Sequence, residues 1–442
     1  MEIKNYDLKP IPRNLVAKSS LDEIYLSIKI GNGQIGGNKV SLNGKLLAKG
    51  NLTEPTYIGS SESLKNEVIT VETNVLDVNG FTNRCVITTS FVNQNKEELF
   101  AKIDKGDAPE NGVASFKAKY LLKFMMVLIL FCSFFNQKVL AQSTSSELEF
   151  ENLETPTSPG LILFDETPSS IEKPTTPQGL GLNLLGLGKN GGALEFSPYW
   201  LKDHPDLTAK DMYTNKTPIF SHFGVSIATI NSDTLSFVSA GIRSRLFQSY
   251  GKNVDKLETI KAQIVDMLSE GALSDGQSQV IDSLRILYVG ITEKPIFNID
   301  LAAAFGASSL TKSYDDLELN RWGIWTSFNF RPKGDDFYFT ILTRYINNEK
   351  FEGANVQADL IDLGTRFNYD ILKFTVSLEY VHRMNLTSDI YDDYRLAAIG
   401  SYKLSDNVFI TSTFGKNFSD VNNIIAMAGL NFGFSQKKVK SF

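Results

Sequence analysis

From Leu180 to the C-terminus, apolar side chains alternate with polar or small ones in segments of about ten residues. Ile361 and Leu363 share one face of such a segment, whereas Asp362 and Arg366 share the opposite face. Soluble sandwiches usually expose many Lys and Glu residues on their polar face, but these polar faces carry mainly Gly, Ser, Asn and Arg. The pattern is typical of a transmembrane β-barrel, with apolar side chains toward lipid and polar side chains toward the lumen.

The alternation predicts an all-β fold whose main domain, residues 180–442, is an antiparallel barrel of about twelve strands. The turns between the expected strands are alternately short and long. Because periplasmic turns are the short ones, this order places both termini in the periplasm. The expected strands are 180–187, 193–200, 221–231, 234–247, 296–307, 319–330, 336–346, 357–369, 372–384, 392–404, 407–417 and 423–434.

Residues 252–287 interrupt the strands with a helical pattern. Apolar residues such as Leu257 and Ile260 recur at helical spacing, Gly271 can end the first helix, and Ser274 or Asp275 can cap a second one. With twelve strands we expect a helical hairpin on the periplasmic side of the barrel; with eleven strands it would be external. It would serve as a lid over one barrel mouth or as a docking platform for a protein partner.

Residues 1–117 contain several stretches of alternating or β-branched residues, separated by clusters of Gly, Asn and Ser. They predict a small β-rich domain, either sandwich-like or an open barrel. Cys85 lies in one of the expected strands and is expected in the core of this domain. The segment contains no catalytic constellation.

The stretch KAKYLLKFMMVLILFCSFFNQKVLAQ at 117–142 has the features of a secretory signal peptide. Lysines precede an apolar run of about a dozen residues, which is short for a membrane helix of roughly 20 residues. The residues before the Ala141–Gln142 bond fit a signal cleavage site. We therefore interpret residues 118–141 as an internal, signal-peptide-like apolar helix; a permanent anchor and a buried core helix are the alternatives.

Cleavage would give a mature product of residues 142–442, exported by the Sec machinery and inserted into the outer membrane by the barrel assembly machinery. Residues 1–117 would stay on the cytoplasmic side, because positive charge holds the end that precedes an apolar run inside. A cytoplasmic module joined to a barrel has no obvious mechanical use. The simplest hypothesis is a separate gene product fused by read-through, or a start site assigned too far upstream.

Residues 142–179 are rich in Pro, Thr and Ser, and we expect them to form an extended periplasmic leader. An apolar patch within it, Leu161–Phe164, could pack on a larger structure.

Composition excludes several other classes. The net charge is −6, so no basic surface indicates a nucleic-acid partner. The two cysteines form no Cys-x-x-Cys pair, and the three histidines show no metal-ligand spacing. Phosphate-binding loops and nucleophile elbows are missing from the sequence. We expect no enzyme activity, no catalytic residues, no metal and no cofactor.

The run GGALEFSPYWLKDHPDLT at 191–208, preceded by SPGLILFDETPSSIEKPTTP, resembles the opening of uncharacterised outer-membrane β-barrel proteins of Bacteroidetes-type Gram-negative bacteria. The resemblance covers about residues 142–442. It implies an outer-membrane location in contact with lipid, and it implies no known catalytic residues. The first 117 residues fall outside it.

If the strand faces are assigned correctly, the lumen collects many arginines and fewer acids. One interpretation is a ladder of ion pairs that fills a small, non-conducting barrel used as a scaffold or for partner docking. The other is a narrow, porin-like channel that favours anionic solutes, since rings of Arg or Lys select anions. The lumen candidates are Arg243, Arg245, Arg321, Arg344, Asp362, Arg366, Lys373, Glu379, Arg383 and Arg395.

Overall fold

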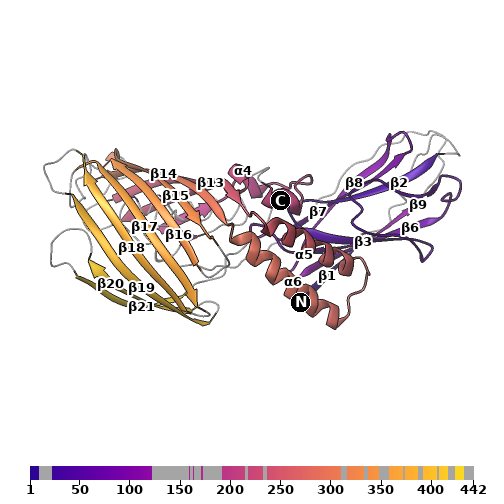
Figure 1. The fold of residues 1–442 in the computed structure, drawn as a ribbon. Helices are drawn as coiled ribbons and strands as arrows, with labels where there is room; N and C mark the ends of the chain where they lie inside the picture. Colours follow the sequence, from indigo (N-terminus) through magenta and orange to yellow (C-terminus); the bar gives the residue numbers. More distant parts are fainter. Residues whose placement is uncertain are drawn as a thin grey trace.

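The chain forms a β-sandwich, a helical hairpin and a broad antiparallel sheet, which follow one another along a long axis (Figure 1). In this computed structural model the described residues are 1–8, 22–121, 159, 163, 171–172, 192–214, 218–231, 236–309, 316–332, 337–347, 358–371, 374–386, 392–405, 408–416 and 424–432.

The β-sandwich consists of two sheets, with strand orders β1-β9-β6-β3-β4 and β5-β2-β7-β8. Its strands alternate buried and partly exposed side chains, because one face of each sheet packs against the other sheet. Ile24, Val71, Phe91 and Tyr120 are at most 2% exposed in this core. Its strands are β1 (Ile3–Asp7), β2 (Glu23–Ile30), β3 (Ile35–Leu42), β4 (Lys45–Gly50), β5 (Thr56–Ser60), β6 (Val68–Leu76), β7 (Arg84–Asn93), β8 (Glu98–Asp107) and β9 (Val113–Leu121).

Strands β3 and β4 are joined by the tight turn Asn43–Gly44. Both residues have positive φ angles, 50° and 86°. Asn and Gly tolerate this conformation better than other residues, which is why an Asn-Gly pair favours a two-residue hairpin turn.

Cys85 lies buried in the sandwich core, as expected from its strand.

The boundary of this module differs from the expected one. Strand β9 continues to Leu121, so Lys117 and Lys119 are strand residues. Lys117 pairs with Glu72 of β6 at 2.6 Å. Two of the three lysines assigned to a signal n-region therefore belong to the sandwich. The rest of the signal-like segment, with the Ala141–Gln142 bond, lies outside the described residues.

The large sheet has twelve strands in sequence order. Each strand from β11 onward pairs antiparallel with the next, whereas the short β10 lies parallel to β11. Within the described ranges no pairing joins β21 to β10 or β11. The strands are β10 (Ile171–Glu172), β11 (Gly192–Phe196), β12 (Gly224–Asn231), β13 (Ser236–Ser249), β14 (Phe297–Ser309), β15 (Glu318–Phe330), β16 (Phe337–Asn347), β17 (Leu360–Ile371), β18 (Phe374–Asn385), β19 (Asp393–Ser405), β20 (Val408–Lys416) and β21 (Ile424–Phe432).

The chain is mostly β, as the alternation predicts. The expected strand at 180–187 lies outside the described residues, and β10 takes the first position in the sheet instead. Because β10 is parallel to β11, the antiparallel run covers β11 to β21, an odd number of strands. The start of β11 and the end of β21 therefore lie at opposite ends of the sheet. The expectation that both barrel termini share one side includes the strand at 180–187, which lies outside the described residues, so it stays a prediction.

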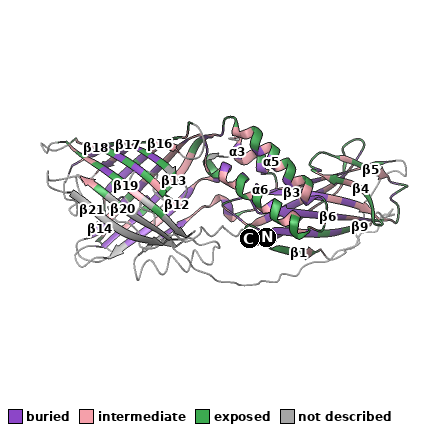
Figure 2. Ribbon diagram, turned by 60° about the horizontal axis from the view of Figure 1, so that its bottom comes forward, coloured by how far each residue is buried: buried purple, intermediate pink, exposed green. Residues whose placement is uncertain are grey.

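Buried and exposed residues alternate along the strands of the large sheet, visibly so in β16, β17 and β18 (Figure 2). We call the face with buried side chains the inner face. Asp362 and Arg366 lie on it, at 1% and 2% exposure, whereas Leu363 and Phe367 on the outer face are 45% and 47% exposed. The sheet therefore buries charged side chains and exposes apolar ones, which is the reverse of the arrangement in a soluble sandwich.

Two longer helices, α5 (Asn253–Leu268) and α6 (Asp275–Glu293), lie between β13 and β14 in the chain. Gly271 has a φ of 94°, which suits the end of a helix, and Ser274 forms a capping box with Gln277 at the start of α6. In the described part of the chain, no helix combines the length and apolar character needed to cross a membrane. Shorter helical turns are η1 (Tyr199–Leu201), α3 (Ala209–Tyr213) and α4 (Pro218–Ser221).

The sandwich and the helices share one hydrophobic cluster. Ile35 and Leu76 come from the sandwich, and Leu257, Ile264 and Ile281 come from the helices; none is more than 2% exposed. Two unrelated gene products joined by chance would not be expected to bury apolar side chains against each other. The structure therefore gives no support to the read-through hypothesis, nor to a location of residues 1–117 across a membrane from the helices.

Candidate functional site: the inner face of the large sheet

An ion-pair cluster lies on the inner face where β16, β17 and β18 are neighbours. Asp362 on β17 accepts hydrogen bonds from Arg344 on β16 and Arg383 on β18, both at 2.8 Å from the arginine Nε. The pairing register places the three residues side by side across the sheet. Because Asp362 is only 1% exposed, the two guanidinium groups replace the water that its carboxylate would otherwise need.

A second cluster lies further along the same strands. Arg366 on β17 is directly opposite Glu379 on β18, which is 0% exposed. Arg395 on β19 reaches Glu379 from the other side, with an N···O distance of 3.2 Å. Arg366 also donates to the Ser377 hydroxyl at 3.0 Å. In both clusters a buried acid has arginines on the two neighbouring strands or directly opposite it in the register.

Two further ion pairs lie at the first strands of the sheet. Arg243 donates to Glu195 at 2.7 Å, and Arg245 donates to Asp300 at 3.0 Å. Glu195 was not among the lumen candidates. Its inward direction could have been read from the alternation in β11, but its pairing with Arg243 depends on how three strands are placed in register.

The structure brings nearly all the candidate residues onto one face. Arg321 is also buried there, at 2% exposure. Lys373 lies outside the described residues. In the described ion pairs of the inner face, five arginines meet four acids. His382, in contrast, lies on the outer face of β18, as its strand parity predicts.

An apolar cluster occupies another part of the inner face. Trp325 on β15 and Leu342 on β16 are each 1% exposed within it. Leu163, which precedes the sheet in sequence, is also completely buried in this cluster. A Cβ on Gly323 would lie 3.2 Å from the Leu163 Cδ1 atom, so glycine at this position leaves room for the leucine. The leader patch therefore does pack on a larger structure, at least through Leu163.

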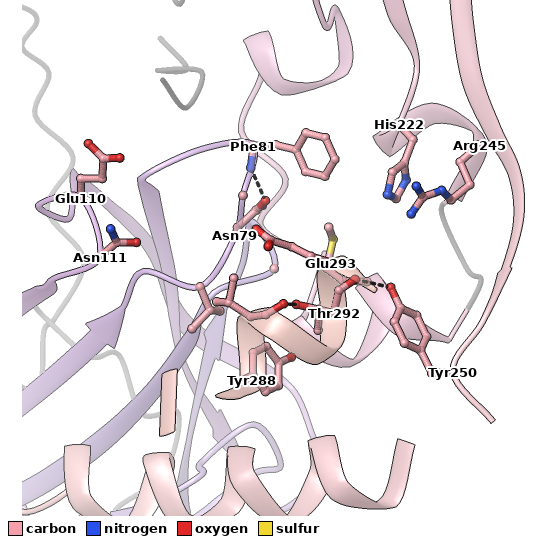
Figure 3. Close-up of a pocket in the computed structure, with 15 residues that line it drawn as sticks. Asn79, Phe81, Glu110, Asn111, His222, Arg245, Tyr250, Tyr288, Thr292 and Glu293 are labelled. Atoms are coloured by element: carbon pink, nitrogen blue, oxygen red, sulfur yellow. Dashed lines mark hydrogen bonds between the residues drawn. The ribbon is translucent and has the colours of Figure 1, made fainter. Parts of the chain in front are cut away.

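A cavity of about 560 Å³ lies where the sandwich, α6 and β13 approach one another (Figure 3). Arg245 and His222 lie on one side of the cavity, and Glu110 lies on the other, in Figure 3. The Tyr250 hydroxyl donates to the Thr292 carbonyl at 2.7 Å, and burial raises the pKa of Tyr250 to about 12. Because groups of both charge signs line the cavity, it favours no single class of ligand.

In the described ranges, no group of three or more His, Cys, Asp or Glu side chains could hold a metal ion. Burial raises the pKa of the Cys85 thiol well above its ordinary value, so this thiol stays protonated and unreactive. These observations give no basis for assigning a catalytic or cofactor role to any described residue.

No family model and no curated protein sequence matches the chain. Similar solved structures include a mutant porin of Rh. blastica, with 11% identity, coverage of 92% of this chain and 100% of that chain, and a TM-score of 0.25. OccK5 (OpdH) of Pseudomonas aeruginosa has 9% identity, 93% and 97% coverage and a TM-score of 0.28. OpdQ of the same species has 10% identity, 94% and 99% coverage and a TM-score of 0.29. Likenesses with TM-scores this low carry no argument about this chain.

Proposed function

We propose that the chain is an outer-membrane β-barrel protein in which the large sheet, from β11 to β21, lies in the bilayer. The observation that carries this proposal is the reversed polarity of the sheet. Buried charges lie on the inner face, while the outer face exposes large apolar side chains over several neighbouring strands. A surface of this kind favours contact with lipid rather than water. Exposed outer-face residues include Ile242, Phe305, Ile324, Phe328, Ile341, Leu363, Phe367, Tyr369, Val376, Leu378, Tyr380 and Leu396.

Strand length supports the same proposal. Strand β13 has 14 residues, and β17 and β18 have 12 each. A tilted transmembrane strand needs about 9–11 residues to cross the hydrocarbon region. These strands are therefore long enough to cross it and to extend slightly beyond it.

Turn length supports an orientation. Strand β17 ends at Ile371 and β18 begins at Phe374, whereas β16 ends at Asn347 and β17 begins only at Leu360. Short turns lie on the periplasmic side of outer-membrane barrels. The α5–α6 hairpin follows β13 at the same end as the short turns, so this end would face the periplasm. Delivery there would require the Sec and barrel assembly machineries.

The inner face suggests a narrow pore that favours anions. Its excess of arginine gives a positive field, and rings of Arg or Lys select anions. In a planar bilayer with a salt gradient, we expect anion-selective conductance. Arg366→Ala should shift the reversal potential toward the cation value, because Glu379 then has one positive neighbour fewer, while Arg366→Lys should largely keep the selectivity. Equal selectivity in the unmodified protein and in both Arg366 variants would contradict the anion preference.

The alternative is a barrel that does not conduct. The paired charges and the apolar cluster around Leu163 and Trp325 favour it, because both fill the inner face with side chains. Such a protein would insert into lipid and show heat-modifiable migration on gels, yet give no current. If the purified protein neither inserts nor shows heat-modifiable migration, the outer-membrane proposal itself fails and a soluble β-protein must be considered.

A further inference from the structure

We propose that the helical hairpin and the segment 198–213 form a docking platform, and that its occupant is the chain's own β-sandwich, strands β1 to β9. The sandwich would stay bound to the platform even when the chain between them is cut. Both parts would then lie in the same compartment. This inference concerns contacts outside the proposed membrane strands, so it does not depend on whether the barrel conducts.

The first contact is made at the C-terminal end of α5. The Asn74 side-chain amide on β6 donates to the carbonyl oxygens of Leu268 and Gly271, each at 2.8 Å. The last carbonyl groups of a helix lack partners within the helix. A side chain of the sandwich therefore caps a helix of the platform. Asn74 and Leu268 are 3% and 0% exposed.

The second contact brings the backbone of β3 against the C-terminal part of α5. A Cβ atom on Gly37 of β3 would lie 2.5 Å from both the Val265 carbonyl oxygen and the Ser269 hydroxyl oxygen. Such distances are shorter than van der Waals contact, so only glycine permits this approach of β3 to α5. The fit of this strand surface is specific to the helix that covers it.

A third contact joins the turn after β2 to the segment that precedes α3. The Asn32 backbone N–H donates to the His204 carbonyl at 2.9 Å, and the His204 N–H donates to the Asn32 side chain at 2.6 Å. The Gly33 N–H donates to the Leu207 carbonyl at 2.7 Å. Positive φ angles of 54° and 66° at Asn32 and Gly33 shape the turn for these bonds.

Apolar side chains fill the space between these polar contacts. Val78 and Val113 of the sandwich belong to one hydrophobic cluster with Leu257, Leu268 and Ile281 of the helices. At the edge, Asp203 lies 2.6 Å from Lys105 and 3.5 Å from Arg84. An apolar centre with charged groups around it is typical of a stable protein interface.

The contacts also restrict where the sandwich can be. Hydrogen bonds of 2.8 Å and a shared apolar cluster cannot form across a bilayer whose hydrocarbon core is about 30 Å thick. Cleavage at Ala141–Gln142 is compatible with the interface, because the contacts are noncovalent. Retention of residues 1–117 on the opposite side of the inner membrane is incompatible with the interface.

The first experiment cuts the connection in the full-length protein. A site-specific protease sequence is inserted after residue 150, and a C-terminal tag is used for purification in detergent after cleavage. We expect the N-terminal fragment to co-purify with the tagged fragment. Its loss in the wash would overturn the proposal.

Variants at the interface test whether its contacts are what retains the N-terminal fragment. Asn74→Ala and Gly37→Leu should each reduce retention of the fragment about tenfold or more, through lost hydrogen bonds and steric overlap respectively. Asn51→Ala, at an exposed loop residue of the same sandwich, is the matched control and should retain it. Circular dichroism of the released fragment checks that the sandwich is still folded. Full retention by a folded Gly37→Leu protein would contradict the interface.

The second experiment tests the compartment. Single cysteines replace Tyr57 of the sandwich and Ile286 of α6, which are 53% and 59% exposed, in a Cys132→Ser background. A membrane-impermeant maleimide is applied to intact cells, to cells with a permeabilised outer membrane, and to lysed cells. Both cysteines should become labelled at the same step. Labelling at different steps would place the two parts in different compartments and overturn the proposal.

Discussion

Asp362 is the residue on which the charge cluster of β16, β17 and β18 depends. It is almost completely buried and accepts hydrogen bonds from Arg344 and Arg383 on the two neighbouring strands. Removing an acid from such a cluster leaves two cations close together with little water to separate them. A buried ion pair adds little stability over apolar side chains, but breaking one is costly.

We expect Asp362→Asn to lower the free energy of unfolding by about 3–5 kcal/mol. The loss follows from like charges that remain buried without their counterion. Urea unfolding in lipid vesicles, followed by tryptophan fluorescence, measures it. The exposed Asp392→Asn should change stability by no more than about 0.5 kcal/mol; similar losses in both variants would show that burial is not the cause.

At the scale of elements, the leader meets the sheet through strand β10 and through the side chain of Leu163. Leu163 precedes the first strand of the sheet, yet it is packed against residues of several strands on the inner face. Gly323 leaves the space it occupies. The leader thus contributes to the apolar cluster on the inner face of the sheet.

Leu163→Ala is expected to destabilise the protein by about 2–5 kcal/mol, because it leaves a cavity in a closely packed cluster. If the barrel conducts, single-channel conductance should also increase. Leu386→Ala, at a position 53% exposed, is the control and should leave both quantities nearly unchanged. Unchanged unfolding of the Leu163 variant in urea would mean that this leucine does not contribute to the core.

At the scale of the whole molecule, the sandwich and the large sheet distribute their polar and apolar side chains in opposite ways. The sandwich buries apolar residues and exposes charges, as a water-soluble domain does. The large sheet buries charges and exposes apolar residues. The helical hairpin joins the two, because it packs against the sandwich while both of its ends continue into strands of the sheet.

The attachment of the sandwich should be insensitive to salt. Its centre is apolar and hydrogen-bonded, and exposed ion pairs such as Lys49–Glu270 at its edge contribute little. In 1 M NaCl the screening length falls to about 3 Å. We expect retention of the cleaved N-terminal fragment at this salt concentration to match that in 0.1 M NaCl, as measured by the amount that co-purifies. Release at high salt would instead assign the attachment to its ion pairs.

The sequence by itself determined which residues share a strand face, because side chains in an extended strand alternate with a period of two. That rule predicted the inner-face direction of Arg344, Asp362 and Glu379. The helical spacing of apolar residues predicted the hairpin. It did not determine which acid meets which arginine, since register is decided between strands, nor did it predict the inward packing of Leu163. Only the tertiary structure decided that Asn74 caps α5 and that Gly37 admits the helix backbone, because those contacts join residues far apart in the chain that no local pattern relates.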